Sequence, residues 1–121
     1  MDPVTGLSLG RIVIGIGALV APGTTARLFG VDPAANPQLG IFGRMFGARE
    51  IALGAVTLAS RGSLRRNLTL VGIAVDGADA AGGVLEVRDG GLPRVQGGAL
   101  VGIALGAVGS GIAALALSRR G

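Results

Sequence analysis

Residues 44–54 read Arg-Met-Phe-Gly-Ala-Arg-Glu-Ile-Ala-Leu-Gly, which places three charges inside a long apolar run. A charged side chain near the centre of a bilayer costs about 2.5–3.5 kcal/mol on insertion scales, so such residues turn inward and pair. The apolar segments on either side of this stretch supply opposite charges. The stretch therefore predicts a bundle of membrane-spanning helices whose polar side chains face one another.

The composition also indicates a membrane protein. Half of the 121 residues are hydrophobic and only 15% are charged, whereas a soluble domain has about 25% charged residues. Cysteine and histidine are absent, which removes thiol chemistry and the usual general base near neutral pH. We therefore expect no enzyme, no catalytic residue, no metal site and no cofactor. The net charge is +4, but the sequence has no basic patch with interspersed aromatic residues, which nucleic-acid binding would need. We therefore expect no nucleic-acid partner.

Four apolar segments separated by proline, glycine and arginine predict an all-α polytopic membrane protein. We expect residues 1–121 to form one domain of four transmembrane helices, with a short interfacial helix near residues 23–30 between the first two. The four long helices are expected at residues 5–21, 38–60, 64–87 and 95–118.

Arginine counts outside the spans predict the orientation, because positively charged loops remain in the cytoplasm. The side that holds both chain ends and the loop between the second and third spans has five arginines: Arg61, Arg65, Arg66, Arg119 and Arg120. The other side has three: Arg27, Arg88 and Arg94. We expect a multi-pass protein of the cytoplasmic membrane with both termini in the cytoplasm.

Six ionisable residues lie within the predicted spans, three of each sign: Arg11, Arg44, Arg49, Glu50, Asp76 and Asp79. The second and third spans are joined by a short turn, so residues that are equally far from this turn should lie at the same depth in the membrane. This geometry predicts the pairs Arg49–Asp76 and Arg44–Asp79. Arg11, from the first span, is expected to reach Glu50 or Asp76.

The acidic residues of the third span share one helix face, because Asp76, Asp79, Gly83 and Glu86 are spaced i, i+3, i+7 and i+10. Three interpretations of the embedded charges remain open. They form a structural network that fixes helix register, or Arg44 or Arg49 holds an anionic ligand such as a lipid phosphate or carboxylate, or the acids form a proton path.

Small residues recur every fourth position and let neighbouring helices approach closely. The predicted packing face contains Gly43 and Gly47 in the second span and, in the fourth span, Gly98, Gly102, Gly106 and Ser110. Such a face serves packing within the bundle or contact with a partner chain.

The form Arg-x-x-Gly-x-Arg-Glu-x-x-x-Gly of residues 44–54 resembles the second helix of uncharacterised small four-helix membrane proteins of actinobacteria and fungi. Residues 11–15 and 75–79 share the resemblance, which implies the membrane fold and no assigned activity. The first functional hypothesis is a non-enzymatic accessory subunit of a larger membrane complex. The alternative is a small oligomeric carrier, or a lipid-binding or anion-binding membrane protein. The expected partners are membrane lipids and either a larger complex or further copies of the chain.

Overall fold

The computed structural model describes residues 2–35, 37–91 and 93–120, and these residues contain five helices and no strand. The helices are α1 (Pro3–Val20), α2 (Pro22–Leu28), α3 (Leu39–Ala59), α4 (Gly62–Arg88) and α5 (Arg94–Arg120). The all-α prediction is confirmed, and the four long helices agree with the predicted ones to within two residues at each end. The short α2 lies between the first two long helices, as expected.

Local sequence explains where the helices begin and end. The Asp2 side chain accepts a hydrogen bond from the Val4 N–H at 3.3 Å and caps the start of α1. Pro22 stands at the first position of α2, where a helix tolerates proline. After α2 and α4 the chain turns at Gly30 and Gly90, whose φ angles are 84° and 82°, a left-handed conformation that suits glycine.

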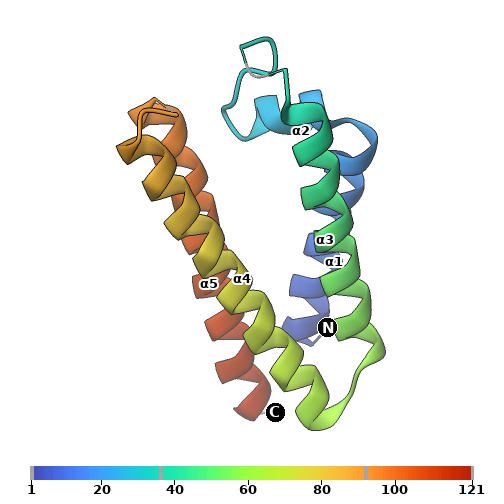
Figure 1. Cartoon of the computed structure of the whole chain (residues 1–121). Coiled ribbons are helices and arrows are strands. Elements are labelled where there is room, and N and C mark those ends of the chain that lie inside the picture. The colour runs from blue at the N-terminus through green and yellow to red at the C-terminus, as the bar shows by residue number, and fades with distance from the viewer. Residues whose placement is uncertain (1, 36, 92, 121) are drawn as a thin grey trace.

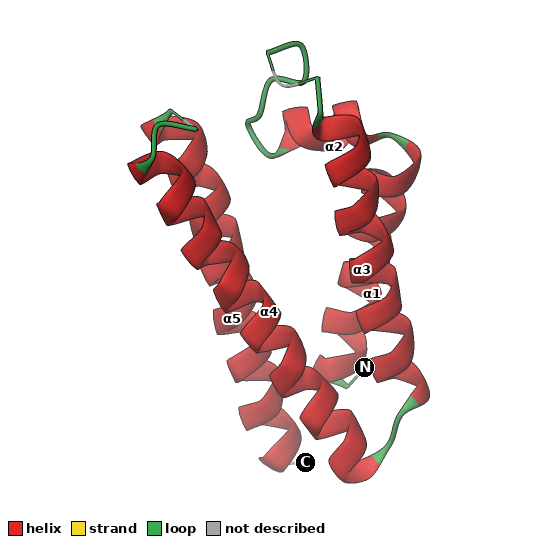
Figure 2. Cartoon of the chain, viewed as in Figure 1, coloured by secondary structure: helices red, strands yellow, loops and turns green. Residues whose placement is uncertain are grey.

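The long helices form two hairpins (Figures 1 and 2). One hairpin consists of α1 and α3 with α2 at its end, and the other consists of α4 and α5. The hairpins approach each other at the end that holds the start of α1, the α3–α4 turn and the end of α5, and they diverge toward the opposite end. The predicted ion pairs between the second and third spans assumed that α3 and α4 pack along their whole length. In the structure, α3 packs mainly on α1, and α4 packs mainly on α5.

The interior of the protein contains charged side chains, whereas many large apolar side chains are exposed. The buried apolar side chains are small or medium, namely Val4, Ala18, Val31, Ala80 and Ala114. Three charged side chains are buried with them, namely Arg11, Glu50 and Asp76. In contrast, many large apolar side chains are exposed, among them Val13 at 69%, Val20 at 73% and Leu28 at 80%. This distribution fits a lipid environment better than water.

Among the described residues, three helices are long and apolar enough to cross a membrane: α1, α4 and residues 94–117 of α5. The chain is thus a helical membrane protein. The 21-residue α3 has a similar length, but every 18-residue stretch of it contains the three charges of Arg44, Arg49 and Glu50, so it is not among these three helices.

Candidate functional site

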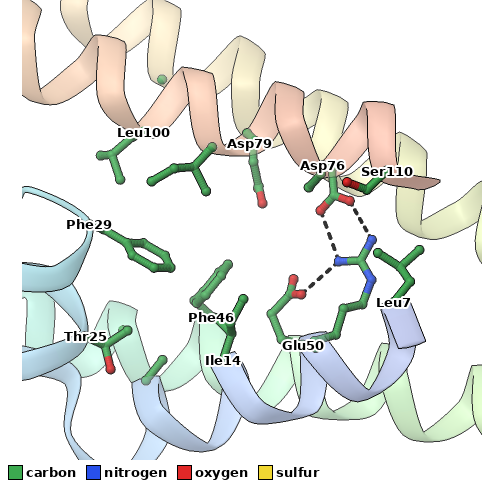
Figure 3. Close-up of a pocket in the computed structure, with 18 of the residues that line it drawn as sticks. Leu7, Ile14, Thr25, Phe29, Phe46, Glu50, Asp76, Asp79, Leu100 and Ser110 are labelled. Carbon is green, nitrogen blue, oxygen red and sulfur yellow. Dashed lines mark hydrogen bonds and ion pairs between the residues drawn. The ribbon is translucent and has the colours of Figure 1, made fainter. Parts of the chain in front are cut away.

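Arg11 joins the two hairpins through its guanidinium group. Its Nη1 donates to Glu50 Oε2 at 2.8 Å and to Asp76 Oδ1 at 3.1 Å, and its Nη2 donates to Asp76 Oδ2 at 2.5 Å. The three side chains come from α1, α3 and α4 and are all buried (Figure 3). The sequence predicted that Arg11 reaches Glu50 or Asp76, and it binds both. We call these three residues the Arg11 cluster.

Gly72 makes room for this guanidinium group. A methyl group at Gly72 would lie 2.8 Å from Arg11 Nη2, well inside van der Waals contact. Gly72 precedes Asp76 by four residues, so the two share one face of α4. Sequence reasoning missed Gly72, although its position one turn before a buried acid was a usable signal.

Arg49 forms the second ion pair between the hairpins. Its Nη2 donates to Asp79 Oδ2 at 2.7 Å and to Glu50 Oε1 at 3.4 Å, and its guanidinium lies 5.0 Å from the centre of the Phe46 ring. Its Nε is buried and has no hydrogen-bond partner among the described residues. The predicted pair Arg49–Asp76 is wrong, because Arg11 occupies Asp76 and Arg49 contacts the acid one turn farther along α4.

The predicted pair Arg44–Asp79 is also wrong. Arg44 is exposed, and its Nε donates to the backbone carbonyl of Leu19 at 3.2 Å. Leu19 lies in the last turn of α1, where carbonyl groups have no partner within the helix. Arg44 therefore caps α1, and it lies outside the lining of the cleft described below.

The predicted small-residue face divides into three parts. Gly43 and Gly47 lie against the start of α2 and against α1: an added methyl group would lie 3.0 Å from Pro22 Cβ and 2.5 Å from the Gly15 carbonyl oxygen, respectively. Ser110 lines the cleft between the hairpins. In contrast, apart from the adjacent backbone of α5 itself, no described atom lies within 4 Å of a methyl group added at any of three α5 positions, Gly98, Gly102 and Gly106.

A cleft of about 1180 Å³ lies between the two hairpins. Aliphatic side chains from both hairpins line it, and the Arg11 cluster lies at one part of its wall. The predicted acidic face of α4 also lines it, with Asp76, Asp79, Gly83 and Glu86. We call Asp76, Asp79 and Glu86 the acidic stripe.

The aromatic residues gather on the opposite hairpin. Phe29, Phe42 and Phe46 all line the cleft, and the chain contains three phenylalanines and no tryptophan or tyrosine. Figure 3 shows Phe29 and Phe46 facing the cleft across from Asp79. The cleft thus combines an acidic wall with an aromatic wall, a contrast that sequence reasoning did not detect.

The family model for a domain of unknown function, DUF4267, matches residues 8–118. The chain belongs to the DUF4267 family. This finding confirms the resemblance to an uncharacterised domain family. Searches of curated proteins and of solved structures gave no match to the chain.

In this DUF4267 protein, the segment that carries the resemblance has a structural role at each fixed position. Gly47 and Gly54 let α3 lie against α1, where added methyl groups would lie 2.5 Å from the Gly15 carbonyl oxygen and 2.6 Å from that of Ser8. Arg44 caps α1, and Arg49 and Glu50 join the two hairpins. The described residues contain no group of His, Cys, Asp or Glu side chains arranged to hold a metal ion.

Proposed function

We propose that this DUF4267 protein is a non-enzymatic membrane protein that holds a small amphiphilic molecule in the cleft between its hairpins. The cleft supports this proposal most directly, because it combines a volume of about 1180 Å³ with apolar walls and charged side chains. Ligand sites typically have volumes of about 300–1,000 Å³, with apolar walls and a few polar groups that orient the ligand.

The charge arrangement supports a ligand site over a network that serves stability alone. A buried ion pair contributes little to stability compared with well-packed apolar residues. Here the ion pairs border a cleft, and Asp79 and Glu86 are accessible from it. An amphiphile entering from the lipid would place its apolar part against the aliphatic walls and its polar part near these residues.

Native mass spectrometry of the protein released from lipid nanodiscs tests this proposal. The wild-type protein should carry a bound non-protein mass. Ala107 lines the cleft, so Ala107→Trp places a large side chain in the cleft and should remove that mass. Ala116→Trp introduces the same side chain at an exposed position of the same helix outside the cleft and should retain the mass. A wild-type protein without bound mass, or equal retention by both variants, would contradict a ligand site in the cleft.

An accessory subunit is the second candidate, and the open α5 positions favour it. Gly98, Gly102 and Gly106 have space for another helix to approach closely. Purification in mild detergent should then yield a stoichiometric partner, or a homo-oligomer, that is lost in Gly102→Leu and kept in Gly77→Leu, an equally open position on α4. A wild-type protein that purifies as a lone monomer would exclude this role.

We further propose that α3 is a fourth span and that both chain ends lie in the cytoplasm. Two of the three α3 charges are paired with residues of other helices, which lowers the cost of placing α3 in lipid. The start of α1, the α3–α4 turn and the end of α5 lie at one end of the molecule (Figure 1). Cysteines placed in the α3–α4 turn should be shielded from impermeant reagents added outside intact cells. Labelling of that turn from outside would contradict the orientation.

A further inference from the structure

We propose that the cleft selects a hydrophobic organic cation, an apolar molecule with one delocalised or amine-borne positive charge. This inference rests on the proposed ligand site and names the class of molecule that it takes. It also replaces the anionic ligand that the sequence suggested for Arg44 or Arg49.

The charge of the cleft lining supports a cation. Among the described residues, four acidic ones line the cleft, namely Glu50, Asp76, Asp79 and Glu86, together with one arginine, Arg11. When Arg49 is added, because it pairs with Asp79, the carboxylates still exceed the arginines by two. The whole chain has the opposite sign, with a net charge of +4. The cleft is therefore a local region of negative charge that attracts cations from its surroundings.

The distribution of this charge places the cation away from the Arg11 cluster. Glu50 and Asp76 already have a cationic partner, because both of them bind Arg11. Asp79 has one ion pair, with Arg49, and Glu86 has none among the described residues. Asp79 and Glu86 are seven residues apart on α4, which corresponds to about 10 Å along the helix. The positive group of the ligand would lie along this part of the acidic stripe.

The aromatic wall supplies the second feature that an organic cation needs. Phenylalanine rings attract cations through their negative faces, and the attraction increases when water is excluded. The chain's three phenylalanines all line the cleft. The Phe46 ring already lies 5.0 Å from the Arg49 guanidinium, so one ring of this wall contacts a cation in the structure. An apolar cation would fit between this wall and the acidic stripe (Figure 3).

Tetraphenylphosphonium and tetraphenylborate test the inference, because the two ions have nearly the same size and shape and opposite charges. Equilibrium binding to the protein in nanodiscs is measured for each ion, and binding to protein-free nanodiscs is subtracted. We expect saturable binding of tetraphenylphosphonium that is lost in Ala107→Trp and retained in Ala116→Trp. Tetraphenylborate should show no binding that depends on the cleft.

Two acidic residues near the end of α4 provide a matched pair for the charge itself. Glu86→Gln should weaken tetraphenylphosphonium binding by about tenfold, because one opposite charge is lost from the cleft. Asp89→Asn should leave binding unchanged, because Asp89 is exposed and lies outside the cleft lining. Equal effects of the two substitutions would contradict placement of the cation along the acidic stripe.

The outcomes separate this inference from the proposed function. Cleft-dependent binding of tetraphenylborate in preference to the phosphonium ion would overturn the cation inference and keep the ligand site. If the wild-type protein carries a bound mass that Ala107→Trp removes, but shows no cleft-dependent binding of the phosphonium ion, the cation inference is likewise overturned and the ligand site is kept. Absence of both the native mass and any cleft-dependent ion binding would overturn the proposed function and the inference together.

Discussion

At the scale of single residues, the guanidinium group of Arg11 makes the buried contacts that join the two hairpins. An arginine has five N–H donors in a planar fork, so one side chain can bind one carboxylate with two parallel bonds and still reach another. Arg11 binds Asp76 in this way and also binds Glu50. A lysine would provide a point charge without this geometry. The hairpins are therefore joined by a group that only arginine supplies.

The space that Gly72 leaves for Arg11 gives a prediction at this scale. Gly72→Ala should lower the free energy of unfolding in detergent micelles by about 1–3 kcal/mol, because the added methyl group overlaps the paired guanidinium. Gly77→Ala is the control, since nothing lies within 4 Å of a methyl group there, and higher helix propensity should make it neutral or slightly stabilising. Equal stability of the two variants would contradict the placement of the guanidinium against Gly72.

The sequence predicted six charged residues inside the protein; three of them are buried, whereas Arg44 is exposed, and only some of their partners were predicted. Charges in apolar spans must turn inward, and this rule alone identified Arg11, Glu50 and Asp76 as interior residues. The partners of Arg44 and Arg49 depended on the register of α3 against α4. That register depends on the binding of Arg11, from α1, to Asp76 and on the divergence of the two hairpins. Neither feature can be predicted from the spacing of residues in the sequence.

At the scale of helices, Arg65 in the first turn of α4 connects the end of α3 to the start of α1. Its Nη2 donates to Asp2 Oδ2 at 2.8 Å and to Thr5 Oγ1 at 2.6 Å. Its Nη1 donates to the carbonyl groups of Thr57 and Ser60 at 3.2 and 3.4 Å, at the end of α3. Arg65 thus satisfies carbonyl groups that lack partners within the helix. The sequence assigned it only to the positive side of the membrane, because arginine counts carry no information on contacts.

Arg65 and its neighbour Arg66 provide a prediction at the helix scale. Arg65→Gln should lower the free energy of unfolding by about 1–3 kcal/mol, since it removes hydrogen bonds from a charged donor and an ion pair with Asp2. Arg66→Gln removes the same charge from an exposed position and should change stability by less than about 0.5 kcal/mol. Thermal unfolding in one detergent compares the stability of the two variants. Similar losses of stability would show that Arg65 acts through its charge alone and not through its hydrogen bonds.

Helix ends were predictable and helix partners were not. Proline, glycine and clustered arginine interrupt the apolar runs, so all four long helices could be bounded from the sequence. Small residues recur on every long helix, and this pattern does not say which helices pair. The structure places Gly47 and Gly54 against α1 and Gly83 and Gly111 between α4 and α5, while a methyl group added at Gly102 would meet no other helix of the described chain.

At the scale of the whole molecule, the fold is two hairpins joined at one end and open at the other (Figure 1). The apolar contacts between α1 and α3 and between α4 and α5 build each hairpin. The Arg11 cluster and the Arg49–Asp79 pair connect the hairpins across the cleft. The sequence predicted a four-helix domain with embedded charges, but the cleft and its two contrasting walls arise only from the hairpin arrangement.

Double-mutant cycles test the central claim, that Arg11 joins the hairpins through Asp76, most directly. The free energy of unfolding is measured for Arg11→Gln, Arg49→Gln, Asp76→Asn and the two double variants that contain Asp76→Asn. The Arg11–Asp76 cycle should give a coupling energy of about 1–3 kcal/mol, the range for side chains in direct contact. The Arg49–Asp76 cycle should give a clearly smaller value, because these two side chains are linked only through their neighbours. A larger coupling for Arg49–Asp76 than for Arg11–Asp76 would contradict the claim and restore the register expected from the sequence.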